Sequence, residues 1–171
     1  MPEIKDSGAR REFDSGAVRD IQENKGRCDL MPLDVVGDFV DWVQTDLVDP
    51  TNAWRNNGAV LRHLYTFMDT KDIPHLFCAL CRFADSQNID VYSLLLDTAV
   101  HYEQGCNKYG ERNWERGIPL HSFIDSAARH YLKCLRGDAD ERHDRAFVWN
   151  VLCAAWTLKH RPELDDISIP Q

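Results

Sequence analysis

Three acidic side chains lie close together in the last third of the chain, in a pattern that could hold metal ions. Asp140 and Asp144 are four residues apart, and the run Glu141-Arg142-His143-Asp144 has the spacing ExxD. On a helix from about Ala139 to His160 these acids share one end of one face. Carboxylate oxygens suit Mg²⁺ and Mn²⁺. An ordinary charged first turn is the alternative, because the helix dipole offsets part of the mutual repulsion.

A helix expected from Asp90 carries another group of polar residues. Asp97 and His101 share one face, whereas Glu103 points about 120° away from Asp97, so this helix alone does not present all three to one ion. The loop that follows, from Lys108 through Asn113 to Trp114, combines glycine, cations and aromatic rings. Such a loop can grip a phosphate and stack a base. A solvated loop anchored by Trp114 is the other interpretation.

The next expected helix repeats charged residues at intervals of four. Asp125, Arg129 and Lys133 have this spacing, which is typical of an ion-paired surface. Beside a metal site, Arg129 and His130 would instead contact phosphate. Asn150 interrupts the apolar run of the last helix and is either a satisfied core amide or a group that contacts a base edge.

The first 32 residues have neither a helical nor a strand period. Asp6-Ser7-Gly8-Ala9-Arg10 is echoed by Asp14-Ser15-Gly16-Ala17 with Arg19 two positions later, and Lys25-Gly26-Arg27 follows. Glycine lets backbone NH groups approach a ligand, and arginine makes planar, paired contacts to phosphate. The spacing GxxxxGK[ST] of a nucleotide-binding P-loop is absent. Composition alone favours a surface arm with turns.

Beyond Asp34, apolar residues recur at intervals of three and four, which predicts helices. No segment of any length alternates in the manner of a strand. We therefore expect an all-α fold with a helical core between about residues 90 and 160. The expected helices run from about Asp34 through Val43, over Val60–Phe67, over Pro74–Phe83, from an N-cap at Asp90 to breaks at Gly105 and Gly110, from a cap at Ser122 to Gly137, and from about Ala139 to His160.

The charge balance argues against a polyanionic partner. Acids outnumber Lys and Arg by 28 to 20, which gives a formal net charge of −8. A non-specific DNA or RNA coat needs a basic footprint, so no nucleic acid polymer is expected as a partner. A small phosphorylated ligand needs only a few cations or a metal ion, and a metal ion itself needs acids.

The hydropathy pattern excludes a membrane span, because no run of 18 apolar residues exists. The polar N-terminus does not resemble a secretory signal. The six cysteines are therefore expected to be reduced thiols in a cytosolic protein. Cys78-Ala79-Leu80-Cys81 has the spacing of a zinc knuckle, but two small apolar residues on a helix explain it better.

Several motifs in fixed order resemble the phage dATP/dGTP diphosphohydrolase family. They cover residues 5–32 and 97–152, whereas 38–90 has no such counterpart. The N-terminal part is the run from Asp14 to Asp20, continuing over Lys25–Pro32. The C-terminal part comprises His101-Tyr102-Glu103-Gln104-Gly105, Lys108-Tyr109-Gly110, Asn113-Trp114, Arg129-His130, Gly137, and His143 through Trp149-Asn150.

By this resemblance the chain is one MazG-like all-α domain over residues 1–171. Residues 1–32 would be a substrate-binding arm, 38–90 a helical insertion and 91–160 the catalytic helices. The related enzymes hold two or three Mg²⁺ or Mn²⁺ ions between helices. Glu141 and Asp144 match the ExxD motif and Glu103 the first acidic motif, so these three are the candidate catalytic residues and metal ligands. Asp125 or Asp97 would supply a further ligand.

The resemblance also implies a reaction. A deoxynucleoside triphosphate, dGTP or dATP, would be hydrolysed to the monophosphate and pyrophosphate, in phage nucleotide metabolism in the host cytoplasm. The dGMP would feed synthesis of 2-aminoadenine nucleotide. MazG-like enzymes usually form dimers or tetramers, so a homo-oligomer is expected. The candidate substrate-binding residues are Arg19, Lys25, Arg27, Lys108, Asn113, Trp114, Arg129, His130, Lys133 and Asn150.

Two other functions remain open from the sequence. His143-Asp144 is an HD dipeptide with His101 and His130 upstream, which suggests an HD-type triphosphohydrolase that releases intact triphosphate. The second is a nucleotide-binding phage protein without catalytic activity, which the incomplete first acidic motif favours.

Overall fold

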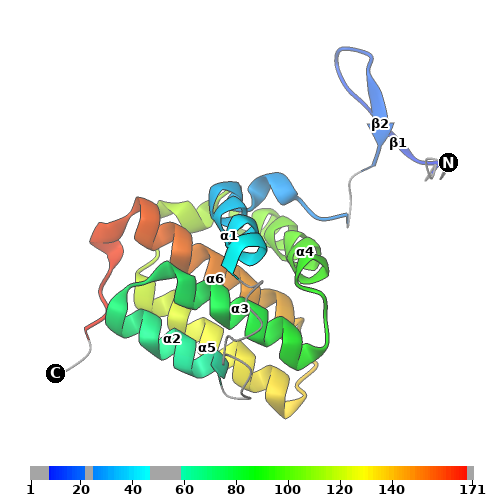
Figure 1. Cartoon of the computed structure of the whole chain (residues 1–171). Coiled ribbons are helices and arrows are strands. Elements are labelled where there is room, and N and C mark those ends of the chain that lie inside the picture. Colours follow the sequence, from blue (N-terminus) through cyan, green and yellow to red (C-terminus); the bar gives the residue numbers. More distant parts are fainter. Residues whose placement is uncertain (1–7, 22–24, 47–58, 169–171) are drawn as a thin grey trace.

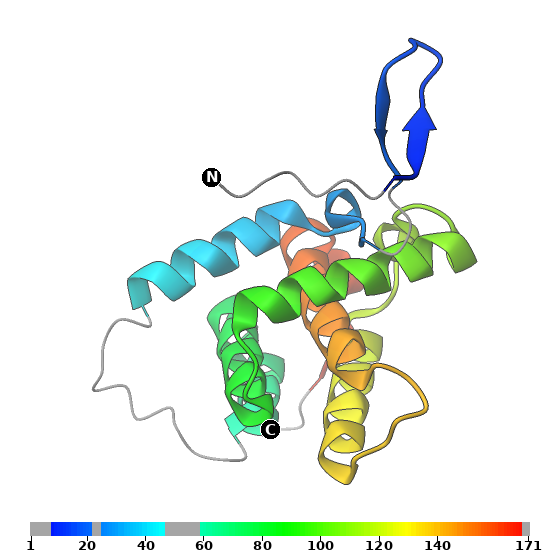
Figure 2. The same cartoon turned by 90° about the vertical axis from the view of Figure 1, so that its right-hand side faces the viewer.

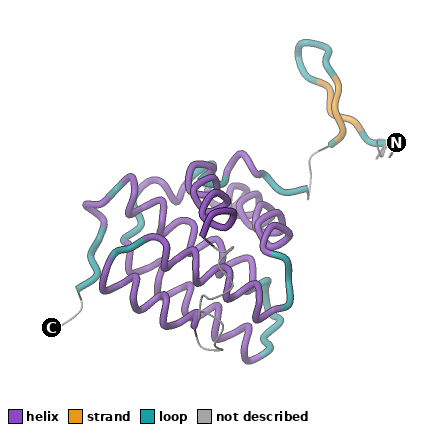
Figure 3. The backbone as a smooth tube through the Cα atoms, viewed as in Figure 1, coloured by secondary structure: helices purple, strands orange, loops and turns teal. Residues whose placement is uncertain are grey.

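The computed structural model describes residues 8–21, 25–46 and 59–168, and these form helices except for one short hairpin (Figures 1 and 3). The expectation of an all-α fold is confirmed. No helix in this part of the chain is both long and apolar enough to cross a membrane.

Helix α6 (His143–His160) lies at the centre of the fold. Most of its residues are buried, among them Phe147, Val151 and Leu152, as expected for a helix that is apolar on nearly all sides. It contacts α1 (Leu33–Asp46), α3 (Ile73–Gln87), α4 (Val91–Tyr109) and α5 (Leu120–Arg136). Packing against these four helices therefore fixes the position of the N-terminal end of α6.

The other helices complete the layer around α6 (Figure 2). Helix α2 (Ala59–Thr70) packs on α3, and α3 ends at Asn88 in the left-handed conformation. The predicted N-cap Asp90 is confirmed, since its carboxylate accepts a 2.9 Å hydrogen bond from the Ser93 amide. Gly137, with φ of 81°, ends α5 as predicted.

Three predicted helix boundaries are wrong. Gly105 does not break α4, which continues to Tyr109, because one glycine costs a helix only about 1 kcal/mol. Helix α5 begins at Leu120, directly after Pro119, so Ser122 lies inside it. Helix α6 begins only at His143, because Arg142 has φ −83° and ψ 79°, outside the helical region.

The late start of α6 changes the geometry of the acidic group. Asp140 and Glu141 precede the helix, and only Asp144 lies within its first turn. The expected single helical face of three acids therefore does not exist. Glu141 instead sits in the connection between α5 and α6, from which its side chain can turn toward α5.

The N-terminal arm contains a hairpin that the sequence pattern did not predict. Strands β1 (Arg10–Glu12) and β2 (Val18–Asp20) pair antiparallel, with Arg11 opposite Arg19. Each strand has three residues, too few for alternation to be recognised. The hairpin projects away from the helical body (Figures 1 and 2).

The paired cysteines of α3 are core residues, as expected. Burial raises the pKa of Cys78 to about 11 and that of Cys81 to about 12. Both thiols are thus protonated near neutral pH, which makes them poor metal ligands.

Candidate active site

A cavity of about 390 Å³ lies between α4, the 3₁₀ turn η2 (Asn113–Arg116), α5 and α6. It is lined by the residues Leu30, His101, Tyr102, Gly105, Cys106, Tyr109, Gly110, Arg112, Asn113, Trp114, Ile118, Ser126, His130, Glu141, Ala146, Trp149 and Asn150. Five of the predicted site residues are among them, and they come from four separate elements.

Aromatic rings form one wall of this cavity. Trp114 is buried and packs edge-on against Trp156, with ring centroids 4.9 Å apart. Trp149 packs against His101 and Tyr102 at 6.0 Å. Because neighbours hold both indoles, these rings form a rigid surface on which a planar ligand could lie.

Asn113 and Asn150 supply neutral polar groups to the same cavity. Asn150 is buried, and its side-chain amide donates a 2.8 Å hydrogen bond to the Ala146 carbonyl. That bond satisfies the amide within the helix and fixes the orientation of the side chain.

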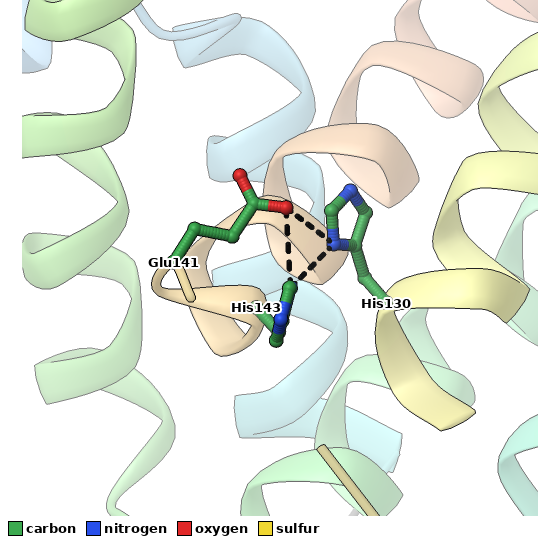
Figure 4. A group of neighbouring side chains, drawn as sticks. All are labelled: His130, Glu141 and His143. Carbon is green, nitrogen blue, oxygen red and sulfur yellow. Dashed lines mark hydrogen bonds and ion pairs between the residues drawn. The ribbon is translucent and has the colours of Figure 1, made fainter. Parts of the chain in front are cut away.

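His130, Glu141 and His143 converge at the edge of the cavity (Figure 4). His130 extends from α5, His143 is the first residue of α6, and Glu141 precedes it. The two Nδ1 atoms are 3.0 Å apart, and Glu141 Oε1 lies 3.5 Å from that of His130 and 3.2 Å from that of His143. Burial lowers the pKa of His130 despite the nearby Glu141 carboxylate, so this imidazole is neutral at pH 7.

Asp140 holds His143 from the opposite side. Its Oδ1 lies 2.7 Å from His143 Nε2, and Lys133 Nζ lies 3.2 Å from its Oδ2. The hydrogen bond with His143, together with Lys133, lowers the pKa of Asp140 to about 2. Lys133 therefore contacts a carboxylate in this structure.

Asp144 belongs to a neighbouring network of charges. Burial alone would raise its pKa, but hydrogen bonds from Arg142 outweigh burial and lower it. The Arg142 guanidinium also donates to Asp97 at 2.9 Å, and Arg145 lies 3.5 Å from the same carboxylate. Arg145 Nε is buried and has no hydrogen-bond partner within the described residues.

Glu103 contacts the arm. Its Oε2 accepts a 2.9 Å hydrogen bond from the Gly26 amide, and the next amide, of Arg27, donates to the Ala99 carbonyl at 3.1 Å. Arg27 also pairs with Asp29 and Glu111. The arm is thus joined to α4 at the residue that resembles the first acidic motif.

The remaining predicted site residues, Asp125 and the cations, lie outside the cavity lining. Asp125 and Arg129 are exposed and form an ion pair on α5. Lys108 stacks over Tyr109, with Nζ 4.8 Å from the ring centre. Lys25 is exposed, 3.8 Å from Asp20, and Arg19 is exposed on β2.

Two groups of potential metal ligands occur in the described part of the chain. They are His130 with Glu141 and His143, and Asp138 with Asp140 and His143. Neither contains Glu103, Asp125 or Asp144. Asp138, Asp140 and His143 are thus the residues that the candidate list lacked, although the HD dipeptide had drawn attention to His143.

Comparison with known families identifies the chain as an enzyme. Residues 85–167 match the family model described as dATP/dGTP diphosphohydrolase, N-terminal, and this segment of the chain is similar to that family. The match spans α4, η2, α5 and α6, which are the elements that form the cavity. No curated protein and no solved structure matches the chain.

Proposed function

We propose that the chain hydrolyses dGTP or dATP to the monophosphate and pyrophosphate, with a divalent metal ion, in the cavity between α4, η2, α5 and α6. The observation that carries this proposal is the meeting of His130, Glu141 and His143 at the cavity edge, within the segment that matches the family. A cavity of about 390 Å³ also has the size of a small-molecule site.

Each wall of the cavity has a role in this proposal. Trp114 and Trp149 would stack the base, and Asn113 and Asn150 would contact its edges. Glu141 reaches the cavity from the α5–α6 connection, where its carboxylate can orient a water and accept its proton. A divalent ion bound beside Glu141 would neutralise phosphate charge and favour attack by water at the α-phosphorus.

The residues outside the cavity act indirectly or through the arm. Asp144 would fix Arg142 and Asp97 beside Glu141, and Glu103 would fix the arm at Gly26. Arg19, Lys25 and Arg27 would contact the triphosphate from the arm. The other candidates keep the roles expected from the resemblance: substrate binding for Lys108, Arg129 and Lys133, and metal binding for Asp125.

The biological setting also rests on the family resemblance. We place the reaction in phage-infected host cytoplasm, where dGMP would enter 2-aminoadenine nucleotide synthesis, and we expect a homodimer or homotetramer. We also propose the division into an arm (1–32), an insertion (38–90) and catalytic helices (91–160); the family match over residues 85–167 covers the last of these three parts.

The direct test incubates the purified chain with each of the four deoxynucleoside triphosphates in Mg²⁺, Mn²⁺ or EDTA. We expect dGMP or dAMP with pyrophosphate, formed only with metal. Release of intact triphosphate would establish the HD-type reaction instead. Binding of dGTP without turnover would establish a nucleotide-binding protein.

Two alanine variants locate the reaction. Glu141→Ala and Asp144→Ala should lose turnover and keep the helical circular dichroism spectrum, because Glu141 precedes α6 and the contacts of Asp144 with Arg142 lie at the helix end, outside the apolar core. Asp69→Ala, at an exposed acid on α2, is the matched control and should retain activity. Full activity in both site variants would contradict the assignment of this cavity.

A further inference from the structure

We infer that His130, Glu141 and His143 form a three-ligand site for a first-row divalent transition metal, which prefers Mn²⁺, Co²⁺ or Zn²⁺ to Mg²⁺. The inference deepens the proposed function, because it assigns metal ligands at the same cavity. This ligand set differs from the all-carboxylate set expected from the sequence. Metal binding in the absence of any nucleotide tests it.

The first argument is the triangle formed by the three donor atoms. Its edges are 3.0, 3.2 and 3.5 Å. Ligands on neighbouring positions of a metal with bonds of about 2.0–2.2 Å lie about 3–3.6 Å apart. The side chains therefore already have the spacing that a bound ion requires, on two helices and the connection between them (Figure 4).

The second argument is the state of the His143 ring. Its Nε2 lies 2.7 Å from Asp140 Oδ1, and the tautomer whose Nε2–H donates to this carboxylate leaves Nδ1 unprotonated. Nδ1 is then a bare lone pair, and it points at His130 Nδ1 and Glu141. A carboxylate behind a histidine in this manner is the usual support of a metal-bound imidazole.

The third argument is the chemistry of the donors. Two imidazole nitrogens and one carboxylate oxygen suit first-row transition metals, whereas Mg²⁺ requires oxygen ligands in a near-ideal octahedron. The His143 side chain is only 1% exposed and that of His130 14%, so both rings are held in place before any ion binds. His130 and Glu141 line the cavity, which leaves the remaining coordination positions open to water or phosphate.

Metal titration of the full chain without nucleotide tests the inference. Co²⁺ should give visible d–d absorption bands at one equivalent per chain, and Mn²⁺ should displace it at lower concentration than Mg²⁺ by a factor of at least about 100. His130→Gln and Glu141→Gln should abolish the bands. His121→Gln, at an exposed histidine paired with Asp166, is the matched control and should leave them unchanged.

The buried His143 could be needed for folding, so the exposed Glu141 carries the decisive variant. Asp140→Asn, which weakens the support of His143 and also removes the charge that pairs with Lys133, should weaken Co²⁺ binding about 10–100-fold and keep the bands. Asp138→Asn separates the two ligand groups, because Asp138 belongs only to the other one. Loss of the bands in Asp138→Asn with retention in Glu141→Gln would overturn the inference.

The outcomes also separate this inference from the proposed function. Tight Co²⁺ binding in a chain that does not hydrolyse dGTP would retain the metal site and reject the function. Hydrolysis in Mg²⁺ with no preference for Co²⁺ or Mn²⁺ would retain the function and reject the metal site. A simple hydrogen bond between His130 and His143 would give no Co²⁺ bands, which also rejects the site.

Discussion

At the scale of single residues, two buried histidines of this fold differ in the side chains that contact them. His143 and His63 are both almost fully buried, and each has the Nδ1 of a second histidine about 3 Å away. A carboxylate supports His143 from behind, and Glu141 completes its group. At His63, burial dominates, with His75 and Arg82 adding positive charge, and together they lower its pKa from 6.5 to about 4.

This lowered pKa predicts that stability depends on pH. Between pH 6.5 and 4 the unfolded chain binds a proton at His63 that the folded protein does not, so stability should fall as the pH falls through this window. The loss should be about 3 kcal/mol over the full window, at about 1.4 kcal/mol for each pKa unit. Urea unfolding at pH 7 and pH 4.5 measures it.

A substitution isolates the contribution of this one histidine. His63→Leu should show a shallower dependence of the unfolding free energy on pH over the same window. An equally steep dependence in the variant would mean that other groups account for the loss. Carboxylates such as Asp140, with its pKa of about 2, contribute only at lower pH.

At the scale of elements, the helices could be predicted but the start of the last one could not. Val148, Val151 and Ala155 lie in an apolar run that predicts α6, and Gly137 predicts the end of α5. The acids at 140 and 141 suit a helical first turn as well as a loop, so local preference does not decide between them. The backbone of Arg142 decides the boundary, and with it the direction of Glu141.

The cavity lining could be predicted in part for the same reason. Residues within or beside long helices, such as His130, Trp114 and Asn150, line the cavity as the motifs suggested. Glu103, a predicted metal ligand, accepts a hydrogen bond from the Gly26 amide in this structure, which is a long-range contact with the arm. Such contacts have no local sequence pattern.

The contact between arm and helix α4 gives a second prediction. Gly26 has φ of 82°, and a Cβ there would lie 2.9 Å from both Ala99 Cβ and the Val100 amide. Gly26→Ala should therefore destabilise the protein by about 2–4 kcal/mol, from steric overlap and left-handed strain together. Thermal unfolding measures the loss.

Gly16→Ala is the matched control, because Gly16 has φ of 80° with nothing within 4 Å of its Cβ position. It carries the strain without the overlap and should cost about 1–2 kcal/mol at most. Equal effects of the two variants would contradict the close approach of the arm to α4.

At the scale of the whole molecule, the cationic side chains of the cavity and those of the hairpin differ in their partners. The cavity-lining Arg112 is engaged by Glu115 and the Asp29 carbonyl. On the exposed hairpin Arg11 and Arg19 lie opposite each other, and the Arg11 guanidinium lies 4.5 Å from the centre of the Phe13 ring. Like charges in this register repel, so the pair costs stability that an anionic ligand would recover. The hairpin thus carries two neighbouring cations although the net charge of the whole chain is −8.

Replacing both arginines tests the role of the arm. Arg11→Ala/Arg19→Ala should raise the KM for dGTP at least about tenfold, because each charge-assisted hydrogen bond to phosphate is worth about 1.5–3 kcal/mol. The helical spectrum should be unchanged, and Arg62→Ala on α2 should leave KM unaltered. An unchanged KM in the double variant would remove the arm from the substrate site.

The central claim is that water attacks the α-phosphorus of dGTP or dATP and displaces pyrophosphate, with the 5′-oxygen staying on the α-phosphorus. Hydrolysis in ¹⁸O-labelled water, followed by mass spectrometry of the products, tests it most directly. We expect one ¹⁸O atom in dGMP or dAMP and none in pyrophosphate. Label in pyrophosphate, or release of deoxynucleoside with intact triphosphate, would contradict it.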